Sequence, residues 1–332
     1  MTDKAITIYD VAREAGVSMA TVSRVVNGNT NVRETTRKKV QAVIDDLGYH
    51  PNAVARGLAS RKSTTVGVLL PSLQNLYFGT VATGIDDVAK IYNYNIFMEN
   101  NNNSITTDAT ILDGLLSKQV DGVILIGQFP NEGMRKRIQS ADVPVVLAGA
   151  NDSAGEIPSV NINYVEATKR ATEKLLKHNE KIALIIAKVK ENIGERTRIA
   201  GYKSAFEEAG LQANDDDIIG ISYEYEDGYK LGKKLVEEGY TAAVTVSDLT
   251  AMGILNYLND NGVKVPEEFE LISSSGTQNA EITRPRITAI EEPTYDVGAV
   301  AMRMLTKMMA NEEVEEETVI LPHVYVDRDT TK

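Results

Sequence analysis

The chain has 332 residues, no cysteine and a net charge of −12, with ten Lys or Arg against six Asp or Glu in residues 1–63 and 25 against 41 in the remainder. The lack of cysteine excludes disulfides, thiolate nucleophiles and cysteine metal sites. No apolar run approaches the roughly 18–20 residues that span a membrane, and the first residues contain no signal-peptide core. We therefore expect a cytoplasmic protein without a membrane partner, whose basic head meets phosphates and whose acidic body is repelled by them.

Residues 7–27 predict two short helices joined by a tight turn. Thr7 is suited to cap the first helix together with Asp10, Gly16 to end it, and Ser18 to cap a second helix. Such a pair is the helix-turn-helix motif, whose second helix places its first residues at base edges in the major groove. We expect the DNA contacts of this head at Thr7, Ser18, Met19, Ala20, Thr21, Ser23, Arg24, Asn27 and Asn31. Val22, Val25 and Val26 are expected to face the core instead.

A third helix over residues 34–47 completes the head, which we assign to residues 1–50. Its residues Arg37, Lys38 and Lys39 either reach phosphates or form an ordinary solvated face, and the sequence does not decide between the two.

Residues 51–63 predict a hinge helix. Pro51 breaks the chain and Asn52 caps a helix of about eight residues, which is too short to be stable alone in water and should fold only when docked. Ala55 keeps this helix slim, Arg56 is a candidate groove or phosphate contact, and Leu58 is a candidate apolar wedge that unstacks a base step. The alternative is a flexible linker whose Leu58 packs on the body.

From Thr64 on, short apolar segments alternate with amphipathic ones. The candidate strands are residues 64–71, 93–99, 121–127, 143–149, 181–187, 217–222, 242–247 and 269–274. Near-continuous apolar strands separated by helices predict parallel sheets covered on both faces, and two such sheets fit the length. No phosphate-binding or nucleophile-elbow motif is present, and His50, His178 and His323 lack metal-ligand spacing. We expect neither an enzyme nor a cofactor or metal.

The stretch YDVAREAGVSMATVSRVVNG, followed by YHPNAVARGL, resembles the LacI family of bacterial transcription regulators. The resemblance covers the whole chain and implies an all-α helix-turn-helix head with a hinge helix, followed by an α/β core of the type I periplasmic-binding-protein kind. The core would contain two Rossmann-like subdomains, residues 64–163 with 292–325 and residues 164–291. The resemblance also implies a homodimer that reads a pseudo-palindromic DNA operator, with both hinge helices in the minor groove. Arg33 departs from the pattern, since the family usually has a small N-cap there.

The resemblance implies three candidate residues for a sugar-type effector in the cleft between the subdomains. Arg198 either contacts the ligand or forms a salt bridge that caps its own helix, and Asp248 either contacts the ligand or caps the helix that follows. Ser275 stands where many relatives have an aspartate that grips ligand hydroxyls. Its presence argues against a dedicated tight sugar pocket.

Residues 291–309 and the final LPHVYVDRDTTK are similar to the catabolite-control members of the family. This similarity implies a regulator of carbon catabolite repression or activation whose corepressor is the phosphocarrier HPr phosphorylated on serine. Sugar phosphates are further candidates, as weak co-effectors. Arg303 and Lys307 share a helix face and could clamp a phosphoserine, although spacing alone favours an ordinary solvated face. The expected corepressor contacts are Asp87, Tyr92, Tyr295, Asp296, Arg303 and Lys307. The rival hypotheses are control by a sugar or nucleobase in the cleft and, from another class, a solute-binding protein.

Overall fold

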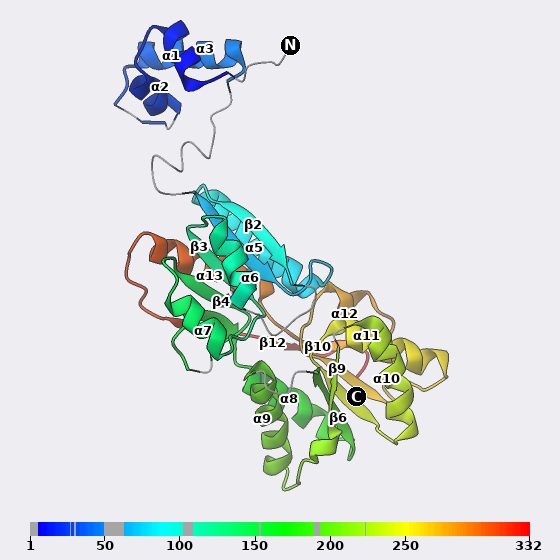
Figure 1. Ribbon diagram of the computed structural model, residues 1–332. Coiled ribbons are helices and arrows are strands. Elements are labelled where there is room, and N and C mark those ends of the chain that lie inside the picture. Colours follow the sequence, from blue (N-terminus) through cyan, green and yellow to red (C-terminus); the bar gives the residue numbers. More distant parts are fainter. Residues whose placement is uncertain are drawn as a thin grey trace. The chain divides into compact units, whose positions relative to one another are not determined.

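The chain is organised as two compact units, residues 1–63 and 64–332 (Figure 1). The computed structural model describes residues 6–26, 28–29, 31–49, 63–101, 109–152, 154–188, 193–222 and 224–332. The expected hinge helix, with Asn52, Ala55, Arg56 and Leu58, lies outside the described residues, as does Asn27. None of the helices among the described residues is long and apolar enough to cross a bilayer.

The described residues of the first unit form three helices, α1 (Ile8–Ala15), α2 (Met19–Val26) and α3 (Glu34–Leu47). The carboxylate of Asp10 accepts hydrogen bonds from the backbone N–H of Thr7 at 3.0 Å and from its hydroxyl at 2.7 Å, which fixes the start of α1. Gly16 ends α1 with a φ of 61°, a left-handed conformation that glycine adopts without strain. The core of this unit includes Val22 and Val25, as the sequence predicts.

The second unit contains two six-stranded sheets. The first has the strand order β11-β5-β4-β3-β1-β2, and all its strand pairs are parallel. Its strands are β1 (Thr65–Leu70), β2 (Asn95–Asn100), β3 (Gly122–Ile126), β4 (Val145–Ala148), β5 (Ser159–Ile162) and β11 (Thr318–Leu321). Its helices are α5 (Leu76–Ile91), α6 (Ala109–Ser117), α7 (Glu132–Gln139) and α13 (Thr294–Met309).

The second sheet has the order β12-β10-β9-β8-β6-β7, and its edge strand β12 is antiparallel to β10. Its strands are β6 (Ile182–Ala187), β7 (Ile218–Ile221), β8 (Ala242–Thr245), β9 (Glu270–Ser273), β10 (Thr288–Glu291) and β12 (Val324–Val326). The helices that accompany it are α8 (Tyr164–Leu176), α9 (Ile193–Glu208), η1 (Asp215–Asp217), α10 (Tyr225–Glu237), α11 (Asp248–Asp260) and α12 (Gln278–Ile282).

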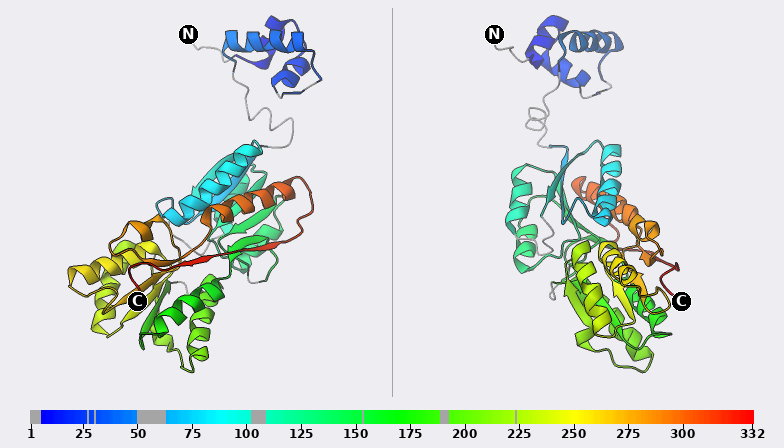
Figure 2. Two further views of the ribbon diagram at one scale, coloured as in Figure 1. Left: turned by 180° about the vertical axis from the view of Figure 1, so that it is seen from behind. Right: turned by 90° about the vertical axis from the view of Figure 1, so that its right-hand side faces the viewer.

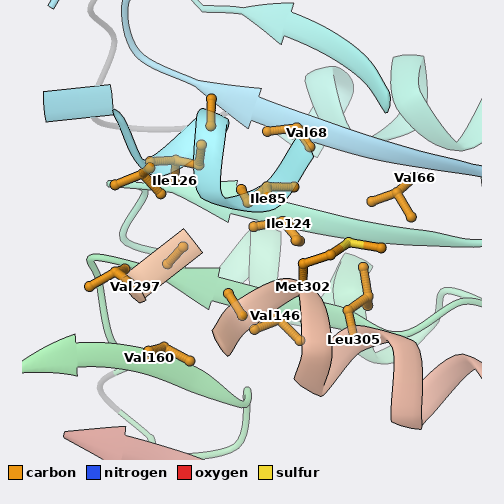
Figure 3. Close-up of a cluster of buried hydrophobic side chains, with 14 of the residues drawn as sticks. Val66, Val68, Ile85, Ile124, Ile126, Val146, Val160, Val297, Met302 and Leu305 are labelled. Atoms are coloured by element: carbon orange, nitrogen blue, oxygen red, sulfur yellow. The ribbon is translucent and has the colours of Figure 1, made fainter. Parts of the chain in front are cut away.

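Helices cover both faces of each sheet, which is why the central strands are buried along their whole length (Figure 2). In β1, Val66 and Val68 point toward α5 and α13, whereas Leu69 points toward α6 and α7. Figure 3 shows the first of these layers, where Ile85 of α5 and Met302 of α13 meet the strands. The alternation explains the near-continuous apolar segments of the sequence.

The chain passes between the two sheets three times, after β5, after β10 and after β11. The last passage corrects one expected boundary. Val324 and Tyr325, which we placed in the first subdomain, pair with Glu291 and Ile290 in the second sheet, because their backbone continues along β10.

Candidate functional site

The predicted DNA-contacting residues lie on α2 and on the segments beside it. The exposed members of the set are Thr7, Ser18, Met19, Ala20, Arg24 and Asn31, and the half-buried members are Thr21 and Ser23. The opposite face of α2, with Val22 and Val25, is buried. The exposed face therefore offers a cation, a hydroxyl and apolar side chains, which are the groups that read base edges and thymine methyl groups.

Local hydrogen bonds hold the two ends of this motif. The backbone N–H of Thr21 donates to Ser18 Oγ at 3.2 Å, and the two hydroxyl oxygens lie 2.9 Å apart, so Ser18 caps α2. The hydrogen bonds from Thr7 and the nearby Arg13 hold the pKa of Asp10 below its ordinary value. Asp10 therefore stays ionised at neutral pH and preserves the start of α1.

The cations of α3 divide into two groups. Arg37 is half-buried, donates to the backbone oxygen of Asn29 at 2.5 Å and lies 3.9 Å from Glu34, so it ties α3 to the preceding loop. Lys38, whose ammonium lies 4.0 Å from Glu34, and Lys39 are exposed and remain candidates for phosphate contacts. Arg33 provides no side-chain hydrogen bond to the first turn of α3, as its departure from the family pattern suggested.

A pocket opens in the second unit. Its walls come from the residues that follow strands of both sheets, where ligands of open α/β folds bind. The residues that line it are Asn75, Tyr77, Phe78, Gly127, Phe129, Gly149, Tyr164, Arg198, Val246, Ser247, Ser275 and Glu292. Two of the three predicted cleft residues, Arg198 and Ser275, are therefore on its wall.

Glu292, which the sequence reasoning missed, is the centre of the polar groups in this cavity. Its carboxylate accepts hydrogen bonds from the hydroxyl of Tyr77 at 3.0 Å and from that of Tyr164 at 3.2 Å. The Arg198 guanidinium lies 3.9 Å from the other carboxylate oxygen and packs on the Tyr164 ring, 4.1 Å from its centroid. Tyr77 belongs to α5 on the first sheet, whereas Tyr164 and Arg198 belong to helices on the second.

Burial raises the pKa of Glu292 to about 7, although Arg198 and the two tyrosine hydroxyls favour the ionised form. Burial also raises the pKa of both tyrosines, so that their hydroxyls remain protonated donors. The carboxyl therefore changes its charge near neutral pH, in a position that joins helices of the two sheets.

Asp248 does not line the cavity. Its carboxylate accepts hydrogen bonds from the Ser273 hydroxyl and, at 2.6 Å, from both the backbone N–H and the hydroxyl of Thr277. It is also not a helix N-cap, because α11 begins at Asp248 itself and Ser247 precedes it as the N-cap residue. The Asp248 backbone N–H donates to Ser275 Oγ at 3.0 Å, so this cluster shapes the turn after β9.

The candidate corepressor residues lie on α5, on its C-cap residue Tyr92 and on α13, and the two helices pack side by side (Figure 2). A glycine on each helix allows the two backbones to touch. A Cβ atom on Gly84 would lie 2.1 Å from the backbone oxygen of Tyr295, and one on Gly298 would lie 2.0 Å from that of Val81. The contact holds the two helices in one fixed arrangement.

We call the surface formed by Asp87, Tyr92, Tyr295, Asp296, Arg303 and Lys307 the α5–α13 surface. Tyr295 and Tyr92 are each more than 40% exposed, and the Tyr295 hydroxyl donates to Asp87 at 3.1 Å. Arg303 and Lys307 are exposed on one face of α13. Within the part of the chain that the structure describes, neither of these cations forms an ion pair. An acidic and aromatic patch thus accompanies two cations that are not neutralised.

Two family models match the chain. One, described as bacterial regulatory proteins of the lacI family, matches residues 7–52. The other, described as periplasmic binding proteins and sugar binding domain of LacI family, matches residues 63–329.

Relatives extend the similarity over the full length. Catabolite control protein A of Streptococcus mutans is 49% identical over 331 residues, which cover 100% of this chain and 99% of that protein. The crystal structure of the transcription regulator CcpA of Lactococcus lactis is 39% identical, with a TM-score of 0.75 over 81% of this chain and 99% of that one. A lac repressor dimer bound to operator and the anti-inducer ONPF shares the fold, with a TM-score of 0.86 at 24% identity over 99% of each chain.

Proposed function

Because the chain belongs to the LacI family of bacterial regulatory proteins, we propose that it regulates transcription in carbon catabolite control, with HPr phosphorylated on serine as its corepressor. It binds pseudo-palindromic operators as a homodimer. The observation that carries the corepressor assignment is the pair of exposed cations, Arg303 and Lys307, beside an aromatic and acidic patch on the α5–α13 surface. The 49% identity to a protein named catabolite control protein A supports it.

The head supplies the DNA contacts. The residues that approach base edges are Ser18, Met19, Ala20, Thr21, Ser23 and Arg24. The other DNA contacts of the head, beside the groove, are Thr7, Asn27 and Asn31. In the hinge, Asn52 caps the docked helix, Ala55 and Arg56 contact the minor groove, and Leu58 opens a base step. These roles predict that hinge variants change operator bending more than nonspecific affinity.

The α5–α13 surface supplies the corepressor contacts. Arg303 and Lys307 share a helix face, so their charges can converge on one phosphoserine, whose charge at neutral pH approaches −2. Because no acidic side chain among the described residues neutralises them, a phosphate does not have to displace an internal partner. Tyr295 and Asp87, already joined by a hydrogen bond, offer a pre-formed aromatic and anionic contact for the basic side of a small partner protein.

The corepressor acts by linkage. It can increase DNA affinity only to the extent that it binds the DNA-competent state more tightly than the other state. A phosphoserine clamp on α13 meets this requirement if α13 takes a different position relative to the second sheet in the two states. The residues just before α13 cross between the sheets, so α13 is placed to respond to such a change.

The alternative function keeps the fold and gives control to a sugar or nucleobase in the cavity. A pocket at the strand ends of both sheets, with Arg198 and Ser275 on its wall, favours it. Against it stand the serine at position 275, in place of a carboxylate, and the engagement of Asp248 with Ser273 and Thr277. A saturable calorimetric signal from one such compound at micromolar concentration would support this alternative over the protein corepressor.

The test of the proposed function is an anisotropy titration against a labelled pseudo-palindromic duplex. The titration runs at one fixed salt concentration, since phosphate contacts make DNA affinity steeply salt-dependent. We expect HPr phosphorylated on serine to tighten binding roughly tenfold or more, about 1.4 kcal/mol per factor of ten, and unphosphorylated HPr to have no effect. The double variant Arg303→Ala/Lys307→Ala should lose this enhancement and keep its basal affinity.

The matched control removes a second pair of exposed cations at the same spacing, Lys230 and Lys234 of α10. The variant Lys230→Ala/Lys234→Ala should respond to the phosphorylated partner like the wild type. Equal enhancement in the wild type and in the Arg303/Lys307 variant would refute the clamp.

A further inference from the structure

Thr64, the residue directly before β1, has a backbone conformation that β-branched residues rarely adopt. Its φ is 51°, in the left-handed region. The other non-glycine residues with a positive φ among those that the structure describes are Asn93, Gln119 and Asn311. These three lie just beyond the ends of α5, α6 and α13, where a left-handed residue commonly closes a helix. Thr64 stands before a strand instead, so other contacts have to hold its conformation.

The backbone of Thr64 is held by residues at the beginnings of the two strands that flank β1. The carboxylate of Asp121, the residue before β3, accepts a hydrogen bond from the Thr64 N–H at 2.7 Å. The Thr64 carbonyl oxygen accepts the backbone N–H of Asn95, the first residue of β2, at 2.8 Å. The Asp121 N–H donates in turn to the carbonyl oxygen of Thr65 at 2.8 Å. Both polar groups of the Thr64 backbone are therefore fixed to the first sheet.

Asp121 provides the one side-chain contact in this arrangement that is both short and charged. A hydrogen bond to an ionised carboxylate is stronger than one between neutral groups. Asp121 is half-buried and lies close to Tyr94, whose pKa is raised by burial and by the charge of Asp121. Tyr94 itself packs on the apolar core that α5 and α13 form with the strands. Asp121 thus joins the beginning of β1 to the core.

The position of Thr64 in the chain gives this contact a consequence. The boundary between the two compact units falls between residues 63 and 64, where the expected hinge meets the first sheet. A change in one φ angle at this point would rotate everything that precedes it relative to the sheet. Strained residues persist where the surrounding contacts over-determine them, and they are concentrated at functional sites.

We propose that Asp121 is a positioning residue for operator binding, because it holds Thr64 in the left-handed conformation and so sets the direction in which the hinge leaves the core. In a homodimer, the two hinges have to leave in directions that match the two halves of one operator. Nonspecific binding depends on phosphate contacts and does not need this match. This role rests on the proposed reading of an operator and is independent of the corepressor.

The experiment compares the affinity of the full chain for a labelled pseudo-palindromic duplex and for a scrambled duplex of the same composition, by anisotropy at one fixed salt concentration and without HPr. Asp121→Ala should weaken operator binding by about fivefold or more, the effect of one lost hydrogen bond to a charged group, and leave binding to the scrambled duplex unchanged. Asp121→Asn keeps an oxygen acceptor at the same place and should restore operator binding. Asp142→Ala removes an exposed carboxylate before β4 of the same sheet and is the matched control, expected to bind like the wild type.

A second variant removes the same hydrogen bond from its other side. Proline has no N–H and a φ near −65°, so Thr64→Pro should lose operator affinity although Asp121 is intact. The double variant Asp121→Ala/Thr64→Pro should lose no more than either single variant, since both remove one interaction. Urea denaturation of each protein separates positioning from stability. A residue that only stabilised the core would lower the free energy of unfolding and leave the ratio of operator to nonspecific affinity unchanged.

The proposed role of Asp121 is wrong if the folded Asp121→Ala and Thr64→Pro variants keep the wild-type ratio of the two affinities. It is equally wrong if the losses of the two single variants add up in the double variant. A wild type that binds both duplexes equally would refute the proposed function itself, and the role of Asp121 with it.

Discussion

Glu292 illustrates how the environment of a single side chain can set its charge. Three groups favour the carboxylate form, namely Arg198 and the hydroxyls of Tyr77 and Tyr164, yet burial outweighs them and raises its pKa to about 7. Arg198 at 3.9 Å is at the outer limit of an ion pair, and both tyrosine hydrogen bonds go to the same oxygen. The donors therefore compensate only part of the lost hydration.

The pKa of Glu292 predicts a pH-dependent contribution to stability. The folded value of about 7 lies above the ordinary value of 4.5, so the folded chain holds the proton more tightly than the unfolded chain. This tighter proton binding contributes at most roughly 3 kcal/mol to the free energy of unfolding. The contribution is fully present below about pH 4.5 and is lost as the pH rises through 7. Glu292→Gln escapes this loss, so its free energy of unfolding should rise relative to the wild type between pH 5 and pH 8.

Urea denaturation of both proteins at pH 5, 6, 7 and 8 measures this difference. Glu237→Gln, at an exposed position, should show a difference from the wild type that stays constant with pH. A constant difference for Glu292→Gln as well would mean that this carboxyl does not titrate in the range.

The helices α5 and α13 are in backbone-to-backbone contact. A side chain at Gly84 would meet the backbone oxygen of Tyr295, which cannot move aside as a flexible side chain can. Asp87 lies on α5 and Tyr92 is its C-cap residue, whereas α13 carries the remaining residues of the α5–α13 surface, so separating the helices also separates the two halves of this surface.

Gly84→Ala should therefore lower the free energy of unfolding by about 1–3 kcal/mol, the usual effect of inserting a methyl group into a packed contact. Gly79→Ala on the same helix is the matched control, because a Cβ atom there meets no other atom within 4 Å. This control should be neutral or more stable by up to about 1 kcal/mol, since alanine is the better helix former. Chemical denaturation compares the two, and equal stability of both variants would contradict the role of the close contact.

The sequence predicted elements well where local patterns determine them. The bounds of α3 are confirmed, and each of the eight apolar segments contains a strand whose ends differ from the prediction by at most two residues, since caps and apolar runs are local features. The missed strands are β5, β10, β11 and β12, and the last two consist of exposed and half-buried residues. Their pairing depends on the passages between the sheets, which no local pattern specifies.

The same reason explains which cavity residues were missed. Arg198 and Ser275 were found through family motifs, but Glu292 follows the unpredicted strand β10. Tyr77 and Tyr164 are 87 residues apart in the chain and meet only because helices of both sheets converge on Glu292. Asp248 was expected in the cleft, and its hydrogen bonds to Ser273 and Thr277 could not be read from its position after a strand.

The two units of the molecule have net charges of opposite sign. Residues 1–63 have ten basic and six acidic side chains, whereas the rest has 25 and 41, so the favourable electrostatic contribution to DNA binding must come from the first unit. Within that unit the cations are not equivalent. Arg37 is committed to the backbone of Asn29, whereas Lys38 and Lys39 are exposed, and Lys38 has only an exposed ion pair with Glu34 at 4.0 Å.

This division predicts how salt dependence changes with mutation. Each lost phosphate contact reduces the slope of log affinity against log salt by about 0.9, so Lys38→Gln/Lys39→Gln should flatten the slope by up to about 1.8 for each head. Lys230→Gln/Lys234→Gln removes the same charge from the acidic unit and should leave the slope unchanged. Anisotropy titrations of all three proteins at several salt concentrations measure it. An unchanged slope in the Lys38/Lys39 variant would mean that these lysines form a solvated face, and the phosphate contacts would then have to come from Arg24 and the hinge.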